Sequence, residues 1–160
     1  MFEDVARLAE TAATDKTDVG DRVAALFPNP SPGVHELMAT AAGTSFEGGI
    51  YRLLELDEVE PFVAACEGLV PEAVGAVRCF GCDWLGRPWG YSMDAEDEVF
   101  VIEPYSGEML VTTATVATLH RETFREIGGQ LMEITLWKEW RKRHPAPRPT
   151  SAPGLSCRSF

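Results

Sequence analysis

Two cysteines separated by two residues form the clearest chemical pattern in the sequence. Cys79 and Cys82 have the spacing of a redox-active pair or of half a zinc site. A structural zinc site needs four ligands, and no second paired spacing occurs among Cys66, Cys157 and the three histidines. Thioredoxin-like chemistry also needs the first cysteine at a helix N-terminus, whereas this pair is predicted to end a strand. A small thiol or zinc protein is thus one alternative, and ordinary buried cysteines are the other.

Patterns for other chemistry are incomplete. The loop 43–49 contains glycine, threonine and serine, but it lacks the lysine that a phosphate-binding loop needs. Ser45 lies in no G-x-S-x-G elbow, and His35 and His120 lie in predicted helices with no nucleophile at a recognisable spacing. We therefore expect no catalytic residue, no metal ligand and no cofactor, and we expect that the protein is not an enzyme.

The size and composition predict one domain. The chain has 160 residues, of which 45% are hydrophobic, which is enough for one sizeable core but short for two domains of usual size. The acidic N-terminus lacks the pattern of a secretory leader, and no apolar run approaches the roughly 18 residues that a membrane helix needs. We expect a cytoplasmic protein with reduced thiols and no membrane partner.

Charge is unevenly distributed along the chain. The formal net charge is −11, yet residues 141–160 hold five of the 14 basic residues and no acidic one. Residues 1–140 thus combine nine basic with 25 acidic residues, a charge of −16. Because phosphate binding depends on lysine and arginine, this balance argues against nucleic acid as a direct ligand and suits a basic protein partner. Acidity that serves only solubility is the alternative.

Helical periodicity dominates residues 1–42. The apolar spacing predicts helices over 2–12 and 18–27, and a third helix that Ser31 caps and Gly43 ends. A short strand is predicted over 50–54. Asp57 and Glu60 have the spacing of a capping box at the start of the next helix.

The centre of the chain predicts an antiparallel meander. Strong turn signals separate four β-like runs at 76–80, 88–93, 99–103 and 109–113. The last two runs are joined by the turn Pro104-Tyr105-Ser106-Gly107.

Two more helices follow the meander. The first begins after Thr115 and is expected to end at Gly128-Gly129, and the second begins near Gln130. The basic, proline-rich tail 144–160 is predicted to be disordered.

Together these elements give an α+β fold, with a central antiparallel meander of about four to five strands packed with N-terminal and C-terminal helices. We expect a single domain over 1–143, in which 1–42 form a helical N-terminal part and 43–143 form the remainder.

The segment from Phe80 to Arg87 predicts a rigid hairpin corner. Trp84 and Leu85 are large anchors, and Gly81 and Gly86 permit backbone conformations that other residues resist. Asp83 and Arg87 can pair across the turn. We favour a core-building role for this corner over direct contact with a partner.

The same segment carries a resemblance to a known family. Five short motifs carry it, in this order along the chain: Gly43-Thr44-Ser45-Phe46, Gly49-Ile50-Tyr51-Arg52, Phe80-Gly81-Cys82-Asp83-Trp84-Leu85-Gly86-Arg87, Glu103-Pro104-Tyr105-Ser106-Gly107-Glu108 and Leu119-His120. This series resembles the C-terminal domain of type VI secretion immunity proteins that protect bacteria from DNase effectors and, more distantly, the SUKH toxin-immunity superfamily. The likeness covers roughly residues 40–140. Cys82 stands where the family has an aromatic residue, and Tyr105-Ser106 replaces a glycine-threonine pair.

The resemblance implies a binding protein. It implies cytoplasmic action, no catalytic residue, no cofactor and a cognate toxin, commonly encoded by the neighbouring gene. The family motif, structural or partner-binding, comprises Phe80, Gly81, Asp83, Trp84, Leu85, Gly86, Arg87, Glu103, Pro104, Gly107 and Glu108. A regulatory or scaffolding adaptor of the same fold is the alternative.

An acidic surface fits that implied function. A nuclease presents a cationic face to DNA, so an anionic inhibitor associates quickly and can cover that face. The candidate acidic partner surface comprises Asp94, Glu96, Asp97 and Glu98, with contributions from Glu103 and Glu108. A solvated turn without a partner is the alternative.

Overall fold

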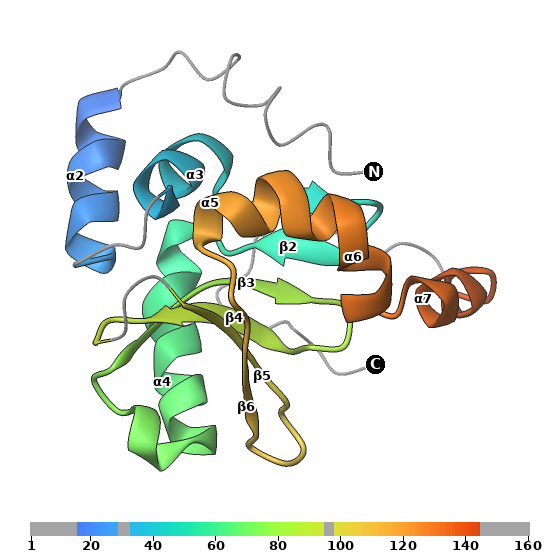
Figure 1. The fold of residues 1–160 in the computed structure, drawn as a ribbon. Helices are drawn as coiled ribbons and strands as arrows, with labels where there is room; N and C mark the ends of the chain where they lie inside the picture. Colours follow the sequence, from blue (N-terminus) through green and yellow to red (C-terminus); the bar gives the residue numbers. More distant parts are fainter. Residues whose placement is uncertain (1–15, 29–32, 95–97, 145–160) are drawn as a thin grey trace.

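Figure 1 shows the fold in a computed structural model, which describes residues 16–28, 33–94 and 98–144. The helices are α2 (Lys16–Leu26), α3 (Val34–Ala41), α4 (Val59–Leu69), α5 (Val116–Thr118), α6 (Phe124–Leu131) and α7 (Ile134–Arg141). The strands are β1 (Ser45–Phe46), β2 (Tyr51–Leu53), β3 (Val77–Asp83), β4 (Pro88–Ser92), β5 (Val99–Ile102) and β6 (Met109–Val111). Short 3-10 turns η1 (Leu56–Glu58) and η2 (Pro71–Ala73) flank α4, and a π-helical turn η3 (Leu119–Thr123) joins α5 to α6.

The six strands form one antiparallel sheet in chain order, β1-β2-β3-β4-β5-β6. This arrangement confirms the α+β class and the central meander. The sheet has six strands where four to five were expected, because the glycine-rich loop before β2 folds back as the two-residue strand β1. A strand this short carries too little pattern to be recognised in sequence.

Helices cover both faces of the central strands (Figure 1). On one face, Cys66 of α4 contacts Cys79 of β3. On the other face, Phe124 of α6 packs its ring edge-on against Tyr51 and Trp89. Burial from both sides explains why β3 shows no alternation of polar and apolar residues, since six of its seven residues are buried.

Two glycines allow the sheet to pack this tightly. The pairing of β3 with β4 shifts register between Cys79 and Gly81, which marks a bulge. A Cβ atom at Gly81 would lie 2.6 Å from the Tyr51 hydroxyl oxygen, and one at Gly90 would lie 2.5 Å from the Arg78 carbonyl oxygen. Only glycine fits either position without a shift of its neighbours.

Several predicted helix ends are wrong by two or more residues. The capping box is formed by Glu55 and Glu58, not by Asp57 and Glu60, and it begins η1 rather than α4. Likewise Gly128-Gly129 lies inside α6, which continues to Leu131, so α7 begins at Ile134 and not near Gln130. The chain instead breaks at Glu133, whose φ of 49° places it in the left-handed region. The cap at Thr115 is confirmed, since its side chain accepts from the Thr118 amide.

Other predictions fall outside the described residues. These are the helix 2–12 and all of the tail beyond His144. The predicted cap at Ser31 is wrong, because α3 begins at Val34 and its N-cap position is Gly33. Within the described ranges, no helix combines the length and the apolar character needed to cross a membrane.

Candidate partner-binding surface

The turn between β3 and β4 is locked by one buried carboxylate. Oδ1 of Asp83 accepts hydrogen bonds from the backbone amides of Leu85 (3.0 Å) and Arg87 (3.1 Å). Oδ2 accepts from Nε of Arg87 at 2.7 Å and from Nε1 of Trp89 at 3.2 Å. Gly86 takes a φ of 79° at the turn. The predicted Asp83–Arg87 pair and the rigid corner are therefore confirmed.

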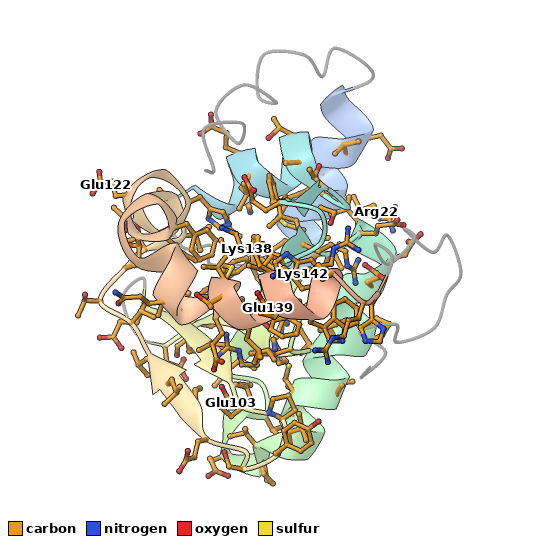
Figure 2. The ribbon with its side chains drawn as sticks, turned by 90° about the vertical axis from the view of Figure 1, so that its right-hand side faces the viewer. Arg22, Glu103, Glu122, Lys138, Glu139 and Lys142 are labelled. Atoms are coloured by element: carbon orange, nitrogen blue, oxygen red, sulfur yellow. The ribbon has the colours of Figure 1, made fainter. Side chains whose placement is uncertain are left out.

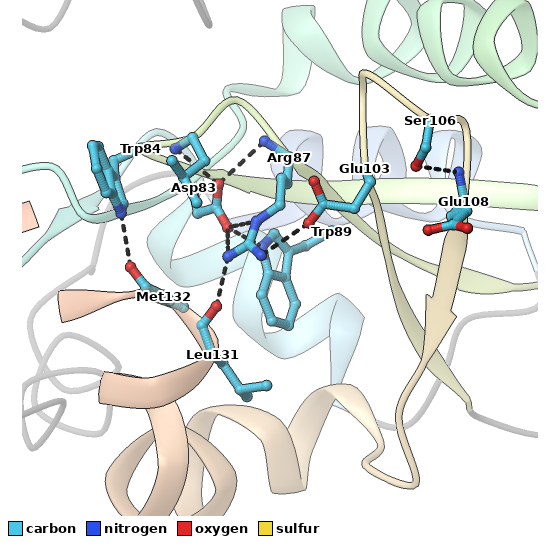
Figure 3. A network of polar contacts seen from close by, with 10 residues as sticks. Asp83, Trp84, Arg87, Trp89, Glu103, Ser106, Glu108, Leu131 and Met132 are labelled. Atoms are coloured by element: carbon cyan, nitrogen blue, oxygen red, sulfur yellow. Dashed lines mark hydrogen bonds and ion pairs between the residues drawn. The ribbon is translucent and has the colours of Figure 1, made fainter. Parts of the chain in front are cut away.

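Arg87 connects this turn to two distant segments (Figure 3). Its Nη1 donates to Oε1 of Glu103 at 3.1 Å, just beyond β5, and its Nη2 donates to the carbonyl of Leu131 at 2.6 Å. Beside it, Nε1 of Trp84 donates to the carbonyl of Met132 at 2.7 Å. The two carbonyls lie at the C-terminal end of α6, where the last carbonyls of a helix have no amide donor within the helix. The side chains of Arg87 and Trp84 supply the missing donors.

Burial and ion pairing oppose each other in this network. Burial raises the pKa of the Asp83 carboxyl above its usual value, and the adjacent Arg87 guanidinium offsets only part of that shift. For Arg87, burial lowers the pKa, but the carboxylates of Asp83 and Glu103 raise it by more, so the net shift is upward. Asp83 is 4% exposed and Arg87 is 8% exposed, with the guanidinium donors directed inward. These two motif residues hold the fold together from inside and offer little surface to a partner.

The second half of the motif forms the turn of the β5–β6 hairpin. The predicted turn is confirmed: the amide of Glu103 donates to the carbonyl of Glu108 at 2.9 Å, and Gly107 takes a positive φ of 70°. The turn packs beside the C-terminal end of α4, since a Cβ atom at Gly107 would lie 3.0 Å from the Leu69 carbonyl oxygen. Pro104, at the start of this turn, is half-buried.

The nearest cysteine partner of Cys79 is not the one that the sequence spacing suggested, Cys82. The Sγ atom of Cys79 lies 3.1 Å from Sγ of Cys66 on α4, and all three described cysteines are buried and form no disulfide. The hydrogen bond with Cys66 and burial raise the pKa of the Cys79 thiol well above its usual range, which disfavours the reactive thiolate. Within the described ranges, no three residues of the metal-binding types come together as a site.

His120 is a buried core residue. Its Nδ1 lies 2.7 Å from the Val116 carbonyl, and its Nε2 lies 3.0 Å from the Tyr51 hydroxyl. The neutral ring thus donates to the carbonyl and accepts from the tyrosine. Burial lowers the pKa of His120 to about 4. The π-helical turn η3 positions this ring, and sequence spacing gave no sign of its contact with Tyr51, 69 residues away.

Among the residues that the structure describes, exposed apolar side chains gather on the β5–β6 hairpin. Seven large hydrophobic side chains are exposed within the described ranges, and four of them lie on this hairpin. Met109, Leu110 and Val111 are 40%, 48% and 54% exposed, and Tyr105 in the turn is 92% exposed. A fifth, Leu69, ends α4 beside the same turn. We call these five residues the β6 surface.

Carboxylates lie at both ends of the β6 surface. At one end Glu108 is exposed, and Glu103 is half-buried because it also binds Arg87. At the other end Glu98, directly before β5, is exposed. Asp94 is also exposed, but it follows β4, which β5 separates from β6. Glu96 and Asp97 lie outside the described residues. The structure thus places one member of the predicted acidic cluster, Glu98, near an apolar strand that the sequence pattern did not single out.

The face formed by α7 differs in character. Figure 2 shows Lys138, Glu139 and Lys142 along this helix, with Glu103 below it toward the hairpin. Nζ of Lys142 donates to Oε1 of Glu139 at 2.5 Å, so opposite charges alternate here. Mixed charge of this kind is ordinary for a solvated helix and favours no particular partner.

The chain matches no family model, no curated protein and no solved structure. Among the described residues, the β6 surface gathers five of the seven exposed large hydrophobic side chains.

Proposed function

We propose that this chain is a cytoplasmic immunity protein that binds and neutralises a cognate bacterial toxin, without catalysing a reaction and without a cofactor. The observation that carries this proposal is the β6 surface: a partly exposed apolar edge strand, with a carboxylate near each end, on a chain of net charge −11. An apolar centre within a polar rim is the usual anatomy of a protein interface.

Exposure of this strand is costly unless it serves binding. Edge strands are commonly shortened, charged or covered, because their free backbone groups invite pairing with other chains. β6 is short, but its three side chains are all apolar and exposed. The three side chains keep 40–54% of their surface exposed, so a partner can bury more of this strand.

The charge indicates what kind of partner fits. A toxin that acts on DNA needs a cationic surface, and an anionic inhibitor is steered toward such a surface at low salt. The motif series from Gly43 to His120 resembles immunity proteins against DNase effectors, which supports the same partner class. A secreted nuclease encoded by the neighbouring gene is therefore the first toxin to test.

The proposal is tested by co-expressing the chain with the product of the neighbouring gene, then measuring cell survival and recovery of the complex. We expect survival and a stable complex. Survival without a complex, or a complex in which the toxin stays active, would contradict the proposed immunity function.

Charge reversal tests the contribution of the acidic rim. Lysine at Asp94 and Glu98 should slow association with the toxin by roughly tenfold at low salt, and the difference should shrink as salt is raised. Lysine at Asp21 and Glu36, two exposed carboxylates on α2 and α3, changes the net charge equally and serves as the control. Equal slowing by both pairs would mean that only overall charge matters.

A further inference from the structure

The backbone of β6 has two outward-facing residues. In the pairing of β5 with β6, Phe100 faces Val111, Val101 faces Leu110 and Ile102 faces Met109. The amide of Glu103 donates to Glu108, and the amide of Thr112 donates to Val99. Hydrogen-bonded and non-bonded pairs alternate along an antiparallel ladder.

That alternation fixes which groups are turned outward. Glu108, Leu110 and Thr112 direct their backbone groups toward β5, so Met109 and Val111 direct theirs away from it. β6 is the last strand of the sheet, and no described strand lies beyond it. Two amide donors and two carbonyl acceptors thus line an open edge.

From these observations we infer that the toxin pairs with β6 through an extended, basic segment that adds a seventh strand to the sheet. This inference rests on the proposed function and specifies how the partner binds. Backbone hydrogen bonds to Met109 and Val111 would supply the pairing, and side chains of the added strand would pack on Leu110 on one face and on Met109 and Val111 on the other.

Charge favours a basic segment over a second copy of this chain. Glu108 stands directly before β6, and Glu98 directly precedes Val99, whose carbonyl accepts from the Thr112 amide at the far end of β6, so a carboxylate lies near each end of the strand. Lysine or arginine flanking a short apolar core would complement both. Two copies of this chain joined edge to edge would instead bring their carboxylates together, against the repulsion of two bodies of net charge −11.

Proline substitution tests this geometry with little disturbance to the fold. Val111→Pro removes an amide that faces the open edge and leaves the pairing of Leu110 and Thr112 with β5 intact. Val111→Ala shortens the side chain but keeps the amide, and it is the matched control. Leu110→Pro, which removes an amide directed at β5, should instead destabilise the hairpin.

The probe is a capped peptide of alternating lysine and valine, acetyl-Lys-Val-Lys-Val-Lys-Val-amide, titrated at millimolar concentration into ¹⁵N-labelled protein. We expect the amide signals of Met109 and Val111 to shift most and to become protected from hydrogen exchange. Val111→Pro should bind about three- to tenfold more weakly than Val111→Ala, the loss expected for one hydrogen bond. A peptide of glutamate and valine should not bind.

Three results would overturn strand addition. They are absence of shifts at Met109 and Val111, equal binding of the acidic peptide, and equal binding of the proline and alanine variants. The neighbouring gene's toxin separates this inference from the function itself. If Val111→Pro still protects cells and binds that toxin as well as wild type does, strand addition is wrong and the immunity function stands.

Discussion

Burial of His120 makes the stability of the fold depend on pH. The ring stays neutral in the folded protein because burial lowers its pKa from 6.5 to about 4. In the unfolded chain the same ring takes up a proton below about pH 6.5. The neutral ring therefore stabilises the fold fully above the unfolded value, and this contribution is lost as the pH falls from about 6.5 to about 4.

The magnitude follows from the gap between the two pKa values, which corresponds to about 3 kcal/mol. Between about pH 7 and about pH 4.5, the free energy of unfolding should fall by about 2 kcal/mol from this group alone. The steepest slope should approach about 1.4 kcal/mol per pH unit near pH 5, the value for one proton.

Urea unfolding across this pH range measures the slope, and His120→Gln provides the comparison. The glutamine side chain cannot titrate, and its oxygen can still accept from the Tyr51 hydroxyl. The carboxylates are common to both proteins, so the difference between the two curves isolates the histidine. Parallel curves for wild type and His120→Gln would refute a buried neutral ring.

Three further predictions concern the core. Arg87→Met should lower the free energy of unfolding by about 3–5 kcal/mol, because it leaves the buried Asp83 carboxylate without its counter-charge. The double variant with Asp83→Asn should recover part of the loss in urea titrations, and an additive loss would contradict the pairing. Gly90→Ala should lower the free energy of unfolding by about 1–3 kcal/mol, because the added methyl group would crowd the Arg78 carbonyl oxygen. An unchanged melting temperature would contradict this close approach. Cys66 and Cys79 should react with a water-soluble thiol reagent only as fast as the protein opens, so rapid labelling of the native protein would contradict their burial.

Local signals predicted the elements whose causes are local. The turn that ends at Gly107 and the pairing of Asp83 with Arg87 depend on residues within four or five positions of each other. Proline, glycine and a carboxylate that accepts nearby amides act at that range in any chain. Both features could therefore be predicted without knowledge of the tertiary structure.

Contacts between distant segments could not be predicted in the same way. Arg87 reaches the carbonyl of Leu131 across 44 residues, and Cys79 meets Cys66 only because α4 packs on β3. The sequence spacing suggested Cys82 as the partner of Cys79, because a sequence motif identifies only residues that are close along the chain. Three consecutive apolar residues in β6 usually indicate burial on both faces, and only the strand order shows that this run lies at an edge.

Hydrogen exchange of the chain in complex with the neighbouring gene's toxin tests the central claim most directly. The β6 surface is predicted to hold the main contact. Binding should slow exchange across residues 108–112 and leave the Asp83–Arg87 turn at its free rate, because that turn is already locked from inside. A complex that protects α7 or the β3–β4 turn and leaves β6 unchanged would contradict the account.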